Sequence, residues 1–204
     1  MLMSGSTLYV VLPLAALYAV FLIWYGGSGR PLTREEIDGY LAALRRNAND
    51  GSGLIQLADV ERMLERDDGR EFIMHNVIRY RQKALYPPGS GYGDSAPAAD
   101  RRYGKAVLPH LLRYGNLPVF IARRSGSFVE PEGIDRWDVV AMVRYRSRRD
   151  FLRFATAITN DRITRHKWAA IENTQVFQVR PIVSLIFVRG AVGALLLAIG
   201  WLLA

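Results

Sequence analysis

The sequence predicts an α+β domain that lies between two apolar terminal segments. The first observation is the uneven charge: the 204 residues are 50% hydrophobic and carry a net charge of +8, yet nearly all charged residues lie in the middle. The second is that strand-like and helix-like periodicity alternate in the order β-α-β-β-α-β between residues 70 and 181. A chain of this length is enough for one domain with anchoring segments.

The first apolar segment, TLYVVLPLAALYAVFLIWY, covers residues 7–25 and follows a short tail of residues 1–6. A helix rises about 1.5 Å per residue, so this uncharged run can cross hydrocarbon about 30 Å thick. A cleaved signal peptide is the alternative, but no Lys or Arg precedes the run and no small-x-small cleavage site follows it. We therefore expect an uncleaved transmembrane helix.

The second apolar segment, IVSLIFVRGAVGALLLAIGWLLA, covers residues 182–204 and predicts a C-terminal transmembrane helix. Arg189 interrupts it near the domain side, where a long side chain can extend to the lipid headgroups. A buried ion pair with another membrane subunit is the alternative for Arg189, and the small residues of GAVGA would let another helix approach closely.

Two spans would place both termini on one side of the membrane and the domain on the other. The terminal tails carry no charged side chain. The side of the domain carries basic residues near the membrane, namely Arg30, Arg34, Lys167 and Arg180. The positive-inside rule then predicts a protein of the cell inner membrane whose domain is cytoplasmic and whose first partner is the lipid bilayer.

Residues 30–69 predict two linker helices. The first begins with Thr33 and Glu36 at capping-box spacing, and apolar residues follow at helical spacing. The second, LADVERMLERDDG, carries apolar residues on one face and ends at Gly69. The polar faces of both helices would lie in water or against lipid headgroups.

Residues 70–181 predict the domain itself, beginning with a strand over residues 70–81 and a long Pro/Gly/Ser loop. A helix follows, with Asp100 as its N-cap and Gly115 as its C-terminal stop. Two strands are expected over residues 117–129 and 136–146.

The second half of the domain begins where Ser147 and Asp150 form a second capping box. This box opens a helical stretch that runs to about residue 173 and is broken near residues 159–161. A last strand covers residues 174–183. The order β-α-β-β-α-β predicts a ferredoxin-like domain, with an antiparallel sheet and both helical segments on one face.

Four segments carry a resemblance to a known family: FIMHNVIRYR, YGKAVLPHLLRYGNLPVFIARRSG, WDVVAMVRYRSRRDFLRFA and HKWAAIENTQVFQV. Over about residues 70 to 181 the chain resembles the family called domain of unknown function 1330, within the dimeric α/β-barrel superfamily. This resemblance implies a homodimer formed through the sheet and a cavity between sheet and helices. Relatives in the superfamily include monooxygenases that need no cofactor, haem-degrading enzymes, dehydratases and binding proteins.

The resemblance also gives two catalytic candidates. His166 in RHKWAAIEN matches a family position at which a helix carries His beside a basic residue. Tyr103 stands at the family's Tyr-Gly step in the first domain helix. A satisfied or partly exposed helix histidine is the alternative for His166, because a catalytic base must meet a demanding geometry.

The candidate ligand-binding residues are Asn76, Met142 and Arg144, which we expect on a mixed apolar and polar strand face. A buried amide such as that of Asn76 needs partners, which could be a ligand carbonyl or a neighbouring backbone group. Arg144 belongs to VRYRSRRDFLRF, residues 143–154, where a strand passes into a helix. We expect Arg144 to be more buried than Arg149, which lies in the first turn of that helix.

Several classes of site have no support in the sequence. There is no cysteine, the three histidines have no metal-ligand spacing, and GSGYG is not followed directly by a helix, so we expect no metal and no cofactor. Nucleic acid is an unlikely partner, since only the net charge favours it.

Two functions remain open. The first is a membrane-anchored homodimer that binds a small apolar ligand, with enzymatic turnover undecided. The second is an accessory or assembly subunit of a larger membrane complex, for which other membrane subunits would be the partners.

Overall fold

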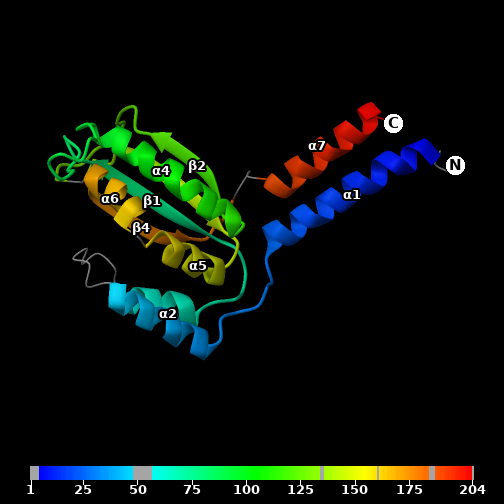
Figure 1. Ribbon diagram of the computed structural model, residues 1–204, viewed down its shortest axis with the longest axis horizontal. Helices are drawn as coiled ribbons and strands as arrows, with labels where there is room; N and C mark the ends of the chain where they lie inside the picture. The colour runs from blue at the N-terminus through cyan, green and yellow to red at the C-terminus, as the bar shows by residue number, and fades with distance from the viewer. Residues whose placement is uncertain (1–4, 48–56, 134–135, 160, 184–186, 204) are drawn as a thin grey trace. The chain divides into compact units, whose positions relative to one another are not determined.

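The computed structural model describes residues 5–47, 57–133, 136–159, 161–183 and 187–203 (Figure 1). The chain divides into two compact units, which are considered separately. One unit is Ser28–Arg180, and the other combines Met1–Gly27 with Pro181–Ala204. The predicted domain and its linker helices therefore belong to a single unit.

The terminal unit consists of α1 (Gly5–Gly26) and α7 (Val188–Leu203). Within the described residues, one helix, Leu8–Gly26, is long and apolar enough to cross a membrane, and α7 is a shorter apolar helix of 16 residues. The expectation of a helix that begins at Ile182 is wrong, because Ile182 lies outside any helix. Whether α7 spans a bilayer stays a prediction.

The two terminal helices contact each other around Arg189. The hydroxyl of Tyr18 donates to the backbone carbonyl of Arg189 at 3.2 Å, and the Arg189 guanidinium lies 4.7 Å from the centre of the Tyr25 ring. A Cβ on Gly193 would lie 3.2 Å from the Tyr18 hydroxyl, so glycine allows this close approach. The arginine in the apolar segment thus has contacts inside its own chain.

The domain contains a four-stranded antiparallel sheet in the order β2-β3-β1-β4. Its strands are β1 (Phe72–Tyr80), β2 (Leu117–Arg123), β3 (Val139–Tyr145) and β4 (Ile171–Val179). In the register, Phe72 of β1 lies opposite Tyr145 of β3, and His75 of β1 lies opposite Phe177 of β4. The fold class is therefore α+β, as the sequence predicts.

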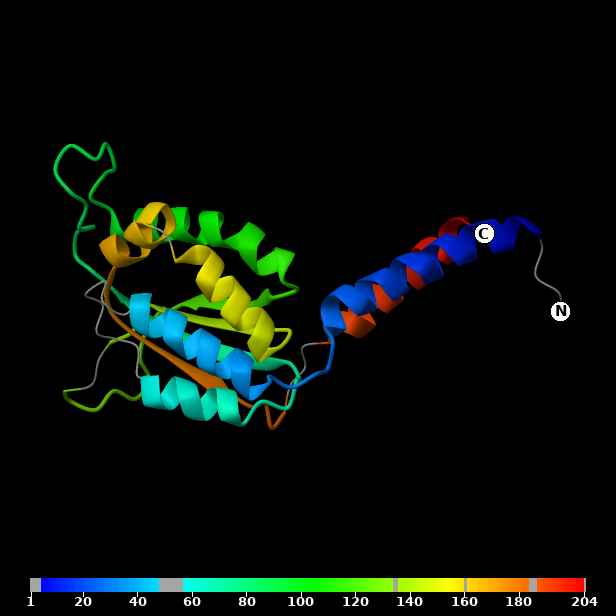
Figure 2. The same ribbon diagram turned by 60° about the horizontal axis from the view of Figure 1, so that its bottom comes forward.

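One face of the sheet is covered by α4 (Ala96–Arg113), α5 (Arg148–Ile158) and α6 (Asp161–Ala170), as Figures 1 and 2 show. Two buried clusters fill the space between sheet and helices. The larger consists of Phe72, Met74, Val107, Leu111, Tyr145 and Phe154, and the smaller of Ala99, Ala169, Ala170 and Ile171. We call this side the helix face and the other side the open face.

The two linker helices are α2 (Arg34–Asn47) and α3 (Leu57–Glu65), and they pack on α5 through a third buried cluster. That cluster consists of Ile37, Leu41, Leu64 and Leu152. The predicted capping box is confirmed, since Glu36 N–H donates to Thr33 Oγ1 at 3.2 Å and Thr33 N–H to Glu36 Oε2 at 2.9 Å.

The second predicted cap is also present, and Gly115 ends α4 as expected. Ser147 is the N-cap of α5, and its hydroxyl accepts from the backbone N–H of Asp150 at 3.1 Å. Gly115 has φ of +68°, and the N–H of Asn116 reaches back to the carbonyl of Leu111 at 2.9 Å. These bonds satisfy carbonyls that the end of a helix leaves free.

Several predicted boundaries are wrong. Helix α4 begins before Asp100, because Ser95 is its N-cap and Pro97 fits the first turn, where its missing N–H is not needed. Helix α6 ends at Ala170, and β4 begins with Ile171 inside the stretch expected to be helical. Strand β2 ends at Arg123 instead of residue 129.

Candidate functional site

The three residues expected to bind a ligand together do not lie on one face of the sheet. Asn76 shares the helix face with Met74, and its amide donates to the carbonyls of Met74 at 3.2 Å and Ala141 at 3.4 Å. Met142 and Arg144 alternate with Ala141 along β3, so they lie on the open face. The expectation that these three residues share one mixed strand face is therefore wrong. The side-chain amide of Asn76 is hydrogen-bonded to backbone carbonyls.

Arg144 is buried and tied to the protein. Its side chain is 4% exposed, against 14% for Arg149, so the predicted order of burial is confirmed. Its guanidinium donates to the Gly115 carbonyl at 2.9 Å through Nη1 and to the Glu71 carboxylate at 3.0 Å through Nε. Arg144 thus fixes the end of β3 against the turn that follows α4.

His166, the first catalytic candidate, is buried under the loop that joins β1 to α4. Its Nδ1 lies 2.7 Å from the Tyr86 hydroxyl, and its ring is edge-on to the Tyr92 ring at 4.9 Å between centres. The guanidinium of Arg102 lies over the Tyr92 ring, 5.3 Å from the ring centre. Burial, followed by the charges of Arg102 and Arg165, lowers the pKa of His166 below its ordinary value.

Tyr103, the second candidate, lies beside a separate polar group at the contact of α4 and α6. Burial, and then the charge of Asp100, raise the pKa of Tyr103 to about 12. The Lys167 ammonium lies 6.0 Å from the Tyr103 ring and 4.7 Å from the Trp168 ring, and burial lowers the pKa of Lys167. Asp100 accepts a hydrogen bond from the Tyr80 hydroxyl at 2.6 Å.

The structure therefore brings both catalytic candidates to the packed layer of α4 and α6. A neutral imidazole and a phenol with a raised pKa can exchange hydrogen bonds with a polar ligand, but a phenol of pKa about 12 is a poor base at neutral pH. Among the described residues, no group of three or more His, Asp or Glu is placed to hold a metal ion.

The open face is rich in apolar side chains that remain exposed. The side chain of Phe120 on β2 is 47% exposed and that of Phe177 on β4 is 44% exposed. Between these edge strands lie Met142 on β3 and His75 on β1, whose ring is edge-on to Phe177 at 4.9 Å. His75 Nε2 is buried and has no hydrogen-bond partner among the described residues.

A pocket of about 510 Å³ opens at the β2 side of this face. Phe120, Ala122 and Val140 form its sheet side, and residues of the connection between β2 and β3 form the rest of its walls. The connection contributes Ser127, Val129, Glu130, Pro131, Arg136 and Trp137, and Arg123 and Arg124 complete the lining. Most of these walls are apolar, so the pocket suits an apolar molecule with little polar surface.

One carboxylate fixes the connection between β2 and β3. Glu130 Oε1 accepts from Arg124 Nη2 at 2.9 Å and from Arg136 Nε at 2.7 Å. Because Arg124 follows β2 and Arg136 precedes β3, the carboxylate joins the two ends of the connection.

Sequence reasoning missed this pocket because of an irregularity in β2. Strict alternation from Leu117 would place Phe120 on the helix face, but the register shifts between Pro118 and Phe120. This shift moves Phe120 to the open face, opposite Met142. Pro118 was the available signal, since proline within a strand is typical of an edge strand or a bulge.

Comparison with solved structures finds the same fold in a protein whose function is unknown. The RPA0582 protein of unknown function from Rhodopseudomonas palustris is 21% identical, with a TM-score of 0.54, and the match covers 62% of this chain and 94% of that one. The structure of methylated RPA0582, also 21% identical, gives a TM-score of 0.52 over 78% of this chain and 98% of that one.

At this identity the likeness extends to the fold alone. No family model matches the sequence, and a search of curated proteins finds no relative. The resemblance to domain of unknown function 1330 thus stays a prediction.

Proposed function

We propose that the protein is a membrane-anchored, ferredoxin-like domain that pairs with a second copy through its open face and binds a small, largely apolar molecule. The observation that carries the proposal is the apolar pocket between the open face and the connection from β2 to β3. The ligand is largely apolar because the walls of this pocket are mostly apolar, and two of the three arginines that line it, Arg124 and Arg136, already contact Glu130.

The ferredoxin-like assignment is supported by the sheet order together with the element order. Helix α4 connects β1 to β2, and α5 with α6 connects β3 to β4. Neither pair of strands is adjacent in the sheet, and α4 and α5 pack on the same face of it. Such a split β-α-β arrangement, repeated once, defines that topology.

Pairing through the open face is supported by its composition. Phe120 and Phe177 are exposed and Met142 lies between them, so together they form an apolar surface. Its exposure to water is unfavourable in free energy. In a symmetric dimer one surface meets its own copy, so each apolar side chain would meet another.

The anchoring proposal rests on α1, whose residues 8–26 have the length and hydropathy of a span. With α7 as a second span, the domain would be cytoplasmic by the positive-inside rule. Binding is proposed and catalysis is not, because His166 and Tyr103 lie on the helix face and the pocket lies on the open face.

Single cysteines test the pairing, because the natural chain contains none. Gln175 lies opposite Val77 on the open face and is exposed, whereas Arg101 is exposed on the outside of α4. With a short bifunctional maleimide, the full chain carrying Gln175→Cys should give covalent dimers and the chain carrying Arg101→Cys should not. Equal cross-linking of the two variants would refute the pairing.

A neutral phenyl diazirine, which labels apolar sites on irradiation, tests the pocket. Peptides from the pocket walls should be labelled in the full chain and protected in Ala122→Trp, whose indole fills the pocket. Ile121→Trp is the matched control, because Ile121 is the neighbouring residue, is 67% exposed and does not line the pocket. Labelling of α1 provides an internal positive control, and unchanged labelling in Ala122→Trp would contradict the proposal.

The accessory-subunit function is the second candidate, and Gly190 on α7 is the observation that favours it, because a Cβ there would meet only Phe187 Cβ, at 3.8 Å. A small residue that lets one apolar helix approach another could serve a further membrane helix in the same way. Purification of the full chain in mild detergent separates the two functions. A homodimer alone supports the ligand-binding function, and stoichiometric co-purifying membrane subunits support the accessory function.

A further inference from the structure

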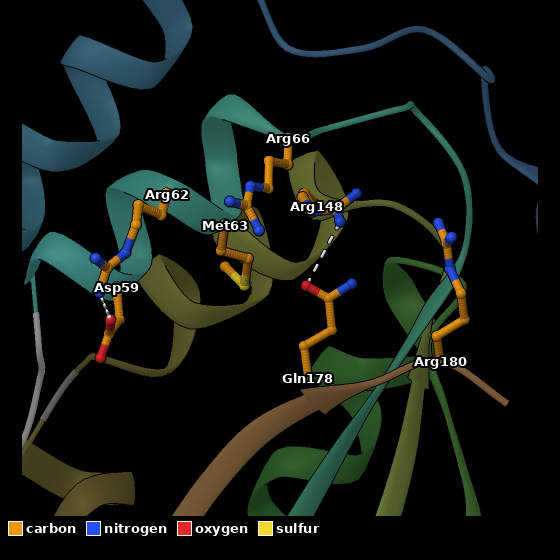
Figure 3. A pocket seen from close by; sticks show the side chains of 7 residues that line it. All are labelled: Asp59, Arg62, Met63, Arg66, Arg148, Gln178 and Arg180. Carbon is orange, nitrogen blue, oxygen red and sulfur yellow. Dashed lines mark hydrogen bonds and ion pairs between the residues drawn. The ribbon is translucent and has the colours of Figure 1, made fainter.

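A second pocket, of about 610 Å³, lies on the opposite side of β4 from the open face. Side chains from α3, from the start of α5 and from the end of β4 surround it, as Figure 3 shows. Its lining is Asp59, Arg62, Met63, Arg66, Arg148, Gln178 and Arg180. Four arginines thus line one pocket, although they come from three separate segments of the chain.

Arg148 is the buried member of this group. Its side chain is 7% exposed, and its Nη1 donates to Asp67 Oδ1 at 3.0 Å and to Asp68 Oδ1 at 3.2 Å. Its Nη2 lies 3.4 Å from Gln178 Oε1, a long hydrogen bond, and its Nε is buried without a partner among the described residues. A buried donor of a charged group without an acceptor costs free energy, so Arg148 is not fully satisfied by the protein groups around it.

The other three arginines are exposed and largely free to bind a ligand. Arg62 pairs with Asp59, and Arg180 Nη2 lies 3.9 Å from Asp68 Oδ2 with its side chain 89% exposed. Arg66 makes no ion pair or hydrogen bond in the described part of the chain. The four guanidinium groups outnumber the three carboxylates that contact them, so the pocket keeps a net positive charge.

We propose that this pocket binds a phosphate group. Several guanidinium groups around one pocket suit phosphate, because its oxygens accept hydrogen bonds from more than one guanidinium at a time. A single carboxylate has two oxygens and would leave part of the arginine cluster without a partner. Gln178 supplies an amide N–H beside Arg148, and Met63 provides an apolar wall for whatever carries the phosphate. This site is independent of the apolar pocket, which lies across the sheet.

Two sources could supply the phosphate group. One is a small soluble phosphate compound. The other is the headgroup of an anionic phospholipid, because Arg180 precedes the apolar helix α7 by only eight residues.

The test uses the full chain in neutral detergent, with inorganic phosphate as the probe. Thermal unfolding is followed while phosphate replaces chloride at constant ionic strength, since a ligand that binds only the folded state raises the unfolding temperature. Arg66→Gln and Arg180→Gln should each weaken the apparent affinity about tenfold, the effect of losing one charge-assisted hydrogen bond.

Arg101→Gln is the matched control, because it removes an equally exposed arginine from α4. It should leave the affinity for phosphate unchanged. Arg66 and Arg180 are exposed, so their replacement leaves the packing of the domain intact, whereas Arg148 is buried and is not a suitable probe. Phosphate that acts no differently from chloride, or equally in all four proteins, would overturn the proposal.

Vesicles distinguish the two sources. The same titration is made with the full chain in vesicles of phosphatidylcholine, with and without phosphatidylglycerol. If a lipid headgroup is the ligand, phosphatidylglycerol suppresses the response to inorganic phosphate in the natural chain. If the ligand is a soluble compound, the response is the same in both kinds of vesicle. Either result supports a phosphate site only when Arg66→Gln abolishes or weakens it.

Discussion

Arg149 on α5 donates from Nε and Nη2 to both carboxylate oxygens of Glu36 on α2, each at 2.8 Å. The same guanidinium donates to the backbone carbonyls of Arg30 at 2.9 Å and Pro31 at 3.0 Å. The Glu36 carboxylate also accepts from the N–H of Thr33, the N-cap of α2, so one arginine fixes both the segment before α2 and the first turn of that helix. A bidentate pair of this kind is stronger and more directional than an ordinary surface pair.

Replacement of Arg149 by Gln should therefore loosen α2 from the domain. We expect the free energy of unfolding to fall by about 1 kcal/mol, since the pair is partly exposed to water. Hydrogen exchange of the full chain should show faster exchange in α2 and unchanged exchange in β1. Arg34→Gln is the control, because Arg34 makes only exposed ion pairs and should change neither quantity.

The effect of Arg149→Gln should also depend on pH. The hydrogen bond from Arg149, followed by that from Thr33, lowers the pKa of Glu36 from 4.5 to about 2. A carboxylate whose pKa is lower in the folded state stabilises the fold above its unfolded pKa, and this stabilisation is lost as pH falls. The difference in the free energy of unfolding between the natural chain and Arg149→Gln should be constant above pH 4.5 and vanish near pH 2. An equal difference at both extremes would show that another contact is responsible.

Gly69 should not tolerate a side chain. Its φ is +70°, and a Cβ there would lie 2.5 Å from the carbonyl oxygen of Gly29. We expect Gly69→Ala to lower the free energy of unfolding by about 2 kcal/mol or more, through the left-handed backbone and the clash together. Gly104→Ala is the matched control, because nothing lies within 4 Å of its Cβ position in α4. It should raise stability by about 0.5 to 1 kcal/mol, which chemical denaturation would measure.

Local signals in the sequence predicted much of the fold, because they depend on neighbouring residues alone. The capping box at Thr33, the N-cap at Ser147 and the stop at Gly115 are of this kind, and all three are present. The sequence predicts the start of α4 at Asp100 only if Pro97 belongs to the preceding loop. The first turn of a helix accepts proline, so Ser95 was an equally good local signal.

The sites could not be predicted in the same way, because they depend on strand register and on partners distant in sequence. The shift at Pro118 brings Phe120 to the open face, and nothing in alternation alone reports it. In VRYRSRRDFLRF, the alternation of side chains along the strand predicts the face on which Arg144 lies. It does not predict the ion-pair partners, because Arg144 pairs with Glu71 and Arg148 with Asp67, both outside that stretch.

His166 should titrate below the ordinary range of a histidine. Burial lowers its pKa first, and the positive charge of Arg102 lowers it further. Because the unfolded chain takes up a proton near pH 6.5 before the folded chain does, the domain should lose stability as pH falls below 6.5.

Nuclear magnetic resonance of the full chain, with the imidazole signal of His166 assigned by its loss in His166→Gln, should give a titration midpoint below 6.5. Arg102→Gln should move that midpoint upward, and Arg101→Gln should leave it in place, because Arg101 is not among the charges that lower it. A midpoint at or above 6.5 in the natural chain would show that the imidazole is more solvated than its contacts with Tyr86 and Tyr92 require.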